Sequence, residues 1–265
     1  MGNLFESLRQ GTSKLLGMPV LASEHGQQVD NLIIYVHWLM IALFVGWFGY
    51  FVYALFRFHG SRNPKADYIG VRNHASNYVE VIVALVEAVI LLFVAVPLWA
   101  KTVDKFPEEK DSTVVQIVAQ QFAWNVRYPG KDAEFGAQNM NLVTSDNVFG
   151  VDPKDPKGKD DIVALNEVHV VVNKPVLIRL SSKDVIHSFK IIAMRVTQDA
   201  IPGMRIPLHF TPTKVGRYQI NCAQLCGQGH ASMASGYLTV QTQEEFDKWI
   251  AAQTPASAGG GGGFD

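Results

Sequence analysis

Both cysteines of the chain lie in one short segment near its C-terminal end. Residues 221–233 read NCAQLCGQGHASM, which places Cys222, Cys226, His230 and Met233 close together. Two thiolates, an imidazole and a thioether form a soft ligand set that suits copper, whereas methionine is a poor ligand for zinc. If this part of the chain is exported, a disulfide between the two cysteines is the alternative. A disulfide would not explain why His230 and Met233 follow at such short spacing. Residues 222–233, called the ligand loop below, therefore predict a copper site.

A further histidine stands where it could complete this site. His187 ends the run SSKDVIH, just after a predicted strand, so it can reach the ligand loop from a neighbouring strand end. His169 and His209 have no comparable companions in the sequence and are interpreted as structural histidines.

The elements that must position these residues are short strands. Segments rich in Val, Ile and aromatic residues alternate with turns that contain Pro, Gly or Asn, a pattern typical of a β-sandwich or a small Greek-key barrel. These segments are 113–128, 167–180, 189–193, 217–220 and 236–240. Between the first two lies the polar stretch 131–161, which lacks the spacing of an EF-hand and is interpreted as a surface loop. A short helix is expected over 244–252, followed by a flexible Gly-rich tail.

Two apolar segments precede the strands. Residues 31–56 contain no Asp, Glu, Lys or Arg, and residues 79–100 contain only Glu80 and Glu87. Each segment is long enough to cross a hydrocarbon core of roughly 30 Å. A pair of buried core helices is the alternative, which the long charge-free run disfavours. The sequence therefore predicts a transmembrane hairpin.

Loop charges predict the orientation of the hairpin. The connection 57–78 carries four basic residues and one acid, Asp67, so the positive-inside rule places it in the cytoplasm and both termini outside. Glu80 and Glu87 are seven residues apart, so they share one face of the second helix. Carboxylates at this depth usually face a partner or a water-filled path, although Glu80 could instead reach the headgroups.

Overall composition agrees with a chain of two unlike parts. The 265 residues have a net charge of −1 and a mean hydropathy of +0.09, an average over the hairpin and a polar exported domain. Near-neutral charge argues against a nucleic-acid binder, and two cysteines are too few for a disulfide scaffold. The expected organisation is an exported segment over 1–30, the hairpin over 31–100, the copper domain over 101–252 and the tail over 253–265.

These motifs, in this order, resemble subunit II of the haem–copper cytochrome c oxidases, the bacterial type especially. The resemblance covers nearly the whole chain. It rests on the hairpin and on the runs QFAW at 121–124, YPG at 128–130, DVIHS at 184–188, DAIPG at 199–203 and the ligand loop.

The resemblance implies a cupredoxin-like Greek-key barrel that carries the binuclear CuA centre. Cys222 and Cys226 would bridge two copper ions, and His187 and His230 would each bind one of them. Met233 and the carbonyl of Gln224 would be weak ligands. It also implies electron entry or docking near Phe122, which stands where the family often has Trp, and near Trp124, Tyr128, Asp184 and Asp199. Glu80 matches the family's acid at a proton path, and Glu87 stands at a commonly apolar or Pro position.

The implied function is electron entry into a membrane oxidase of the inner (plasma) membrane, with the copper domain on the periplasmic side. Cytochrome c, or a c-type cytochrome complex, would reduce CuA. Electrons would pass to haem in subunit I, where oxygen becomes water with coupled proton translocation. Subunits I and III and the lipid membrane are the expected partners, and nucleic acid is not.

Two features bear on the cofactors and the donor. The family usually has Glu where this chain has Gln224, and a neutral amide is a poorer ligand for the magnesium or manganese ion held at that subunit interface. From Lys101 onward seventeen basic residues stand against eighteen acidic ones, so no strong acidic field steers a basic donor.

Three other classes share parts of this pattern. A quinol oxidase subunit II shares the hairpin and barrel but lacks the copper ligands. A membrane-anchored copper carrier or assembly factor has no need of Glu80 or of the run 121–130. A nitrous-oxide-reductase type of CuA domain is attached to a propeller and not to a hairpin.

Overall fold

The computed structural model describes residues 2–65, 68–70, 73–253 and 255. Its contacts divide the chain into two compact units. One unit comprises residues 1–18 and 28–101, and the other comprises residues 19–27 and 102–265. The predicted Gly-rich tail falls almost wholly on residues 254 and 256–265, which lie outside the described residues, as do Asp67 and Arg72 of the basic connection.

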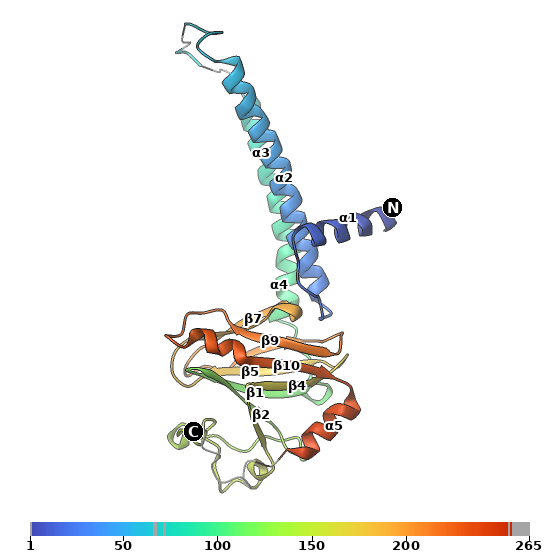
Figure 1. The fold of residues 1–265 in the computed structure, drawn as a ribbon, viewed down its shortest axis with the longest axis vertical. Coiled ribbons are helices and arrows are strands. Elements are labelled where there is room, and N and C mark those ends of the chain that lie inside the picture. The colour runs from blue at the N-terminus through green and yellow to red at the C-terminus, as the bar shows by residue number, and fades with distance from the viewer. Residues whose placement is uncertain (1, 66–67, 71–72, 254, 256–265) are drawn as a thin grey trace. The chain divides into compact units, whose positions relative to one another are not determined.

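The first unit is helical. Helix α1 (Gly2–Leu15) precedes α2 (Gly26–Arg57), and the chain returns through α3 (Ala75–Ile90), a π-helical turn (Leu91–Ala95) and α4 (Val96–Val103). Both long helices are apolar enough to cross a membrane, at Gly26–Arg57 and Ala75–Val103. Figure 1 shows α2 and α3 side by side, and the Lys101 ammonium donates to the Gln28 amide oxygen where the two ends meet. The hairpin predicted from the two apolar segments is therefore confirmed.

A proline explains the irregular turn in the second span. Pro97 has no backbone N–H, and its ring would collide with the carbonyl of Phe93 in a regular α-helix. The π-helical turn at Leu91–Ala95 lies immediately before this position and widens the helix there. Glu80 and Glu87 both lie in α3 before the turn, and both are exposed on the hairpin.

The second unit is a β-sandwich of two five-stranded sheets. One sheet has the order β3-β2-β1-β5-β8 and the other has the order β4-β10-β9-β6-β7. The pairs β1–β5 and β4–β10 are parallel, and the remaining neighbours are antiparallel. The strands are β1 (Thr113–Gln120), β2 (Ala123–Tyr128), β3 (Ile162–Leu165), β4 (Glu167–Val171), β5 (Val176–Ser182), β6 (His187–Ile191), β7 (Val196–Ala200), β8 (Ile206–Phe210), β9 (Gly216–Cys222) and β10 (Gly236–Gln241).

Alternating apolar residues of both sheets form one core, whose largest members include Trp124, Phe189 and Phe210. Helix α5 (Gln243–Ala252) follows β10, and a capping box between Thr242 and Glu245 fixes its start. The predicted all-β domain, here a sandwich, and the short C-terminal helix are both present.

Two segments differ from their sequence expectations. The N-terminal stretch 1–30 is not one segment, because residues 19–27 join the sandwich through backbone hydrogen bonds from Ala22 to Ala193 and from Glu24 to Thr211. The polar stretch 131–161 is attached to the sandwich by a fully buried ion pair between Arg127 and Asp161. Arg127 also donates to the carbonyl of Gly136, so the base of this loop is tied to β2.

Candidate metal centre

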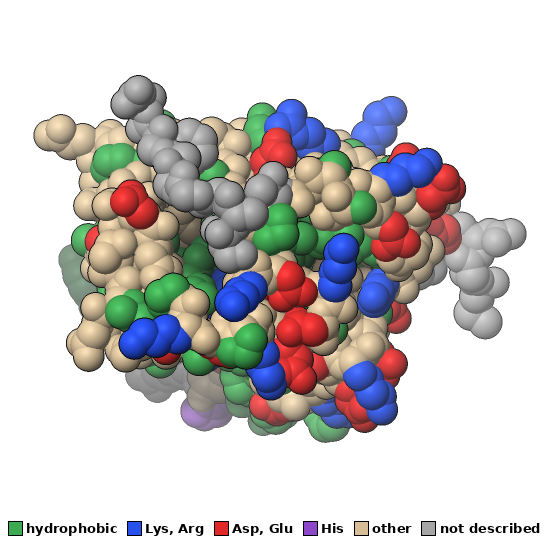
Figure 2. All heavy atoms as spheres, turned by 90° about the horizontal axis from the view of Figure 1, so that it is seen from below, with side chains coloured by type: hydrophobic (Ala, Val, Ile, Leu, Met, Phe, Trp, Pro, Cys, Tyr) green, Lys and Arg blue, Asp and Glu red, His purple; other side chains and the backbone are tan. Residues whose placement is uncertain are grey.

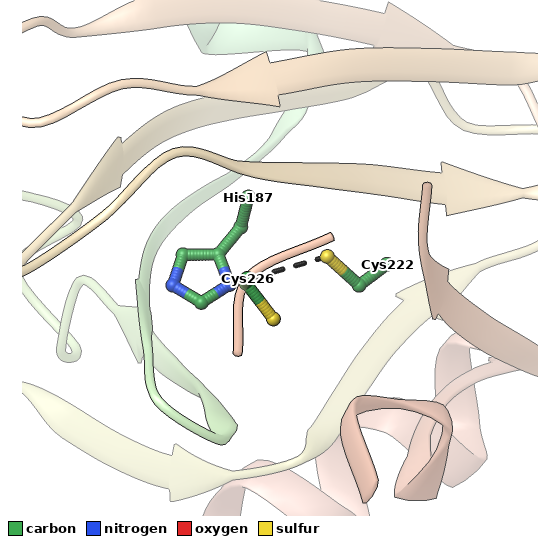
Figure 3. Close-up of side chains that lie close together, drawn as sticks. All are labelled: His187, Cys222 and Cys226. Atoms are coloured by element: carbon green, nitrogen blue, oxygen red, sulfur yellow. Dashed lines mark hydrogen bonds between the residues drawn. The ribbon is translucent and has the colours of Figure 1, made fainter. Parts of the chain in front are cut away.

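The ligand loop begins at the end of β9 and meets the start of β6. His187 is the first residue of β6, and Phe189 of this strand pairs with Cys222 of β9. This pairing brings His187 beside the loop although the two lie far apart in sequence. Ligand atoms of His187, Cys222 and Cys226 all lie within 4.8 Å of one another. Figure 3 shows the imidazole and the two thiols gathered at one point.

Each histidine presents its Nδ1 to one thiol. His187 Nδ1 lies 4.0 Å from Cys222 Sγ, and His230 Nδ1 lies 3.3 Å from Cys226 Sγ. The Cys222 thiol also donates to the carbonyl oxygen of Gln224 at 3.0 Å. Both cysteines are free, so the structure does not contain the alternative disulfide. Met233 is fully buried in the short 3-10 helix His230–Ser235 that ends the loop.

Burial gives the site a low polarity. His187 and Met233 have no exposed surface, and Cys226 is 4% exposed. Burial, together with the neighbouring Cys222, raises the pKa of the Cys226 thiol to about 11. Thiolates are the form that binds metal. A soft metal cation that replaces the thiol protons therefore offsets the cost of ionising Cys226 in buried surroundings.

Asp184 orients His187 from outside the ligand set. The Nε2 of His187 donates to Asp184 Oδ1 at 2.9 Å, which leaves Nδ1 free to face the thiols. Burial opposes ionisation of Asp184, but hydrogen bonds from the Gln121 N–H, His187 and the Val185 N–H outweigh it and hold its pKa below the ordinary value. A carboxylate behind a metal-binding histidine is a common arrangement, since it fixes the ring and its tautomer.

The residues expected at the electron-entry surface separate into two groups. Phe122 is half-buried, Asp184 is partly exposed and Asp199 is exposed on β7. Trp124 and Tyr128 are buried in the core, at 0% and 1% exposure, so neither side chain can touch a docked protein. Trp124 instead packs edge-on against His187, with ring centroids 6.2 Å apart. The Tyr128 hydroxyl donates to the carbonyl of His169. Their burial argues only against direct contact with a docked protein, and their expected part in electron entry stays a prediction.

Two glycines let Phe122 lie against the ligand loop. A Cβ built on Gly229 would lie 2.3 Å from Phe122 Cδ2, and one built on Gly227 would lie 3.1 Å from the same ring. Gly227 also has a φ of +142°, which side-chain-bearing residues rarely adopt. The close approach of Phe122, in the turn between β1 and β2, to the loop thus depends on both glycines.

The remaining histidine predictions can be compared with the fold. His169 is buried, stacks on Trp249 and lies beside Gln241, and His209 packs against Phe106. The metal-ligand geometry described above includes neither residue. Gln121 stood in the sequence only as part of the run QFAW, because its contacts to this site arise only in the folded chain.

A two-helix membrane hairpin followed by a β-sandwich with a Cys/Cys/His ligand cluster defines a membrane-anchored cupredoxin-type domain. The family model described as cytochrome C oxidase subunit II, periplasmic domain, matches residues 113–240, and that of the transmembrane domain matches residues 11–100. The chain belongs to the cytochrome c oxidase subunit II family. The fold class and the family resemblance inferred from sequence are confirmed.

Two sequence relatives agree with this assignment. An alternative cytochrome c oxidase subunit 2 of Bradyrhizobium diazoefficiens is 29% identical over 234 residues, covering 85% of this chain and 80% of the relative. A cytochrome c oxidase subunit 2 of Synechocystis sp. is 30% identical over 258 residues, covering 90% of this chain and 76% of the relative. The periplasmic domain of cytochrome oxidase subunit II of Bradyrhizobium japonicum aligns with a TM-score of 0.41 at 27% identity, over 56% of this chain and 95% of that structure. As a subunit II, this chain is the membrane-bound electron-entry subunit of a haem–copper oxidase, an oxidoreductase complex.

Proposed function

We propose that the ligand loop and His187 hold two copper ions as a CuA centre. Cys222 and Cys226 would supply two thiolates, and His187 and His230 would each supply an imidazole Nδ1. Met233 and the Gln224 carbonyl would be the weak ligands. The observation that carries this proposal is that each histidine Nδ1 faces a different thiol, at 4.0 and 3.3 Å. Two separate sulfur–nitrogen pairs suit two metal ions better than one.

When bound, the two copper ions supply a one-electron couple. The work of the polypeptide is to hold the ligands still, so that little geometry changes when the electron arrives. Asp184 fixes the His187 ring, and the Trp124 indole holds the carbonyl of Met233 at 2.9 Å. Burial of His187, Cys226 and Met233 keeps water away from the ligand atoms. A dry and rigid setting favours fast electron transfer.

The electron donor would be a c-type cytochrome that docks on the exterior side of the membrane. Figure 2 shows acidic and basic side chains interspersed on one face of the molecule. Exposed apolar side chains lie at the ligand loop and just before His187, namely Leu225, Ile186 and Val185. We therefore infer that docking depends more on short-range apolar contacts than on a strong acidic field.

Electrons would pass from this centre to haem in subunit I, with subunit III as a further partner. Oxygen would be reduced to water there, with coupled proton translocation. Glu80 would serve a proton path into subunit I, and Glu87, on the same face of α3, would lie along it. This assignment is supported by the exposure of both carboxylates on the hairpin, which calls for a polar partner in the complex.

A magnesium or manganese site at the interface with subunit I would be weak in this protein. Gln224 is exposed in the ligand loop, where its neutral amide replaces the carboxylate that the family usually provides. The carbonyl of the same residue is main chain, so its proposed copper contact does not depend on this side chain.

Substitution of one bridging ligand tests the function. In the purified oxidase complex, Cys222→Ser is expected to remove the binuclear centre and stop oxygen uptake driven by reduced cytochrome c. The haem spectrum of subunit I should stay unchanged, which controls for loss of assembly. Full cytochrome c oxidase activity in this variant would overturn the proposal.

A further inference from the structure

Gln121 contacts both halves of the proposed ligand set from the turn between β1 and β2. Its side-chain Nε2 donates to the carbonyl oxygen of Cys226 at 2.6 Å. Its backbone N–H donates to Asp184 Oδ2 at 2.7 Å. One residue outside the ligand set therefore touches the ligand loop on one side and the segment before His187 on the other.

The second contact continues to a ligand. Asp184 uses its other oxygen, Oδ1, to accept from the Nε2 of His187 at 2.9 Å. The carboxylate is thus held at both ends, by Gln121 and by the ring that it orients. A chain of three hydrogen bonds runs from the carbonyl of Cys226 through Gln121 and Asp184 to His187.

The ligand loop leaves space for this amide. A Cβ on Gly227 would lie 2.8 Å from Gln121 Nε2, so a side chain at position 227 would push the amide away from Cys226. Gly227 directly follows Cys226, and its φ of +142° turns the loop beneath the β1–β2 turn. Gly227 and the Gln121 amide therefore pack closely together, and neither group is a proposed metal ligand.

We propose that Gln121 is a positioning residue of the metal centre, which ties Cys226 in the ligand loop to the Asp184–His187 pair. This inference rests on the proposed copper function. With one anchor on each half, Gln121 fixes the separation between the two halves, which belong to segments far apart in sequence. Gln121 does not itself bind metal. Its contribution is to restrict the movement of the proposed ligands Cys226 and His187.

Neither of the two side chains most similar to glutamine can replace it in the contact to Cys226. Asparagine is one methylene shorter and would not reach the Cys226 carbonyl. Glutamate has the same length but, when ionised, has no proton to donate to a carbonyl. Both substitutions, like Gln121→Ala, keep the backbone N–H that binds Asp184. The three variants therefore isolate the contact to Cys226.

The experiment compares Gln121→Ala and Gln121→Glu with the wild type in the purified oxidase complex. The readouts are the rate of copper loss to a chelator, the copper hyperfine pattern in EPR and the thermal stability of the complex. Outer-shell partners of metal sites typically contribute about 10- to 100-fold in affinity. Both variants are expected to lose copper on the order of 10-fold faster, with an altered hyperfine pattern.

Gln138→Ala is the matched control, because Gln138 also donates its amide to a carbonyl, that of Phe149, but outside the ligand loop. It should leave copper retention and the EPR pattern unchanged. Wild-type copper retention and hyperfine pattern in both Gln121 variants would overturn the inference, even if their thermal stability fell. Absence of a binuclear signal in the wild-type complex would instead overturn the proposed function itself.

Discussion

The indole Nε1 of Trp124 donates a hydrogen bond to the carbonyl oxygen of Met233, with 2.9 Å between the two atoms. Both residues are fully buried, and the Trp124 ring also packs edge-on against His187. A Cβ on Gly236 would lie 2.7 Å from Trp124 Cδ1, so the chain after Met233 passes close to the indole. One core side chain of β2, that of Trp124, therefore contacts both His187 and the end of the ligand loop.

Trp124→Phe is expected to retain copper but to destabilise the domain and shift the midpoint potential of the metal centre. Phenylalanine keeps one aromatic ring but fills less of the core, and it leaves the Met233 carbonyl buried without its donor, which alone costs about 1–3 kcal/mol. Thermal unfolding and a redox titration of the complex measure the two effects. A variant with wild-type stability and potential would show that the hydrogen bond does not support the site.

Gly229→Ala is expected to weaken copper retention, because the added Cβ would lie 2.3 Å from the Phe122 ring. Either the ring or the ligand loop must move. The double variant Gly229→Ala with Phe122→Ala removes the obstruction and should recover much of the retention, measured as the rate of copper loss to a chelator. Gly11→Ala is the control, since a Cβ there meets no atom within 4 Å. If the double variant is no better than Gly229→Ala, the contact with Phe122 is not the cause.

His25 is expected to make the sandwich less stable in acid. Burial lowers its pKa, the nearby His209 lowers it further, and a backbone hydrogen bond with Arg195 and the charge of Glu24 oppose the shift. Because the unfolded chain then binds more protons than the folded chain, the stability that neutral His25 contributes is complete above the unfolded pKa of 6.5. It is lost progressively as the pH falls below that value towards the folded pKa.

His25→Gln should therefore reduce the fall in melting temperature between about pH 7.5 and about pH 5.5. The measurement is thermal unfolding of the full chain at both pH values. His59→Gln, at an exposed position after α2, controls for the loss of a histidine as such. An equal fall in melting temperature for wild type and His25→Gln would contradict the burial argument.

Glu80→Gln is expected to slow turnover of the complex several-fold and to leave the EPR spectrum of the metal centre unchanged. Glu80 belongs to the helical unit, whereas the proposed ligands all belong to the β-sandwich unit. Oxygen uptake and EPR on one preparation separate the two effects. Unchanged turnover would confine Glu80 to a role at the headgroups.

The parts of the molecule that sequence reasoning found are those with a local signal. A charge-free run of apolar residues predicts a membrane helix whatever surrounds it, and the Cys222–Met233 spacing brings several soft ligands into one loop. His187 could be added because it follows a predicted strand, and a neighbouring strand end can reach the loop. The fold class followed from short β-rich segments and their turns.

The parts that sequence reasoning missed depend on tertiary contacts. The burial of Trp124 and Tyr128 follows from the register of β2 in its sheet, which the run 113–128 does not reveal, because two strands and their turn read there as one segment. The attachment of residues 19–27 to the sandwich has no pattern of its own. Gln121 was visible only as part of a family motif, and its role emerges from contacts 63 and 105 residues away in sequence.

The most direct measurement of the central claim is the EPR spectrum of the oxidised, purified complex. Two copper ions that share one unpaired electron through Cys222 and Cys226 give a seven-line hyperfine pattern, because the electron couples equally to both nuclei. We expect this pattern in the wild-type complex and its loss in Cys222→Ser. A four-line pattern from a single copper ion would contradict this expectation.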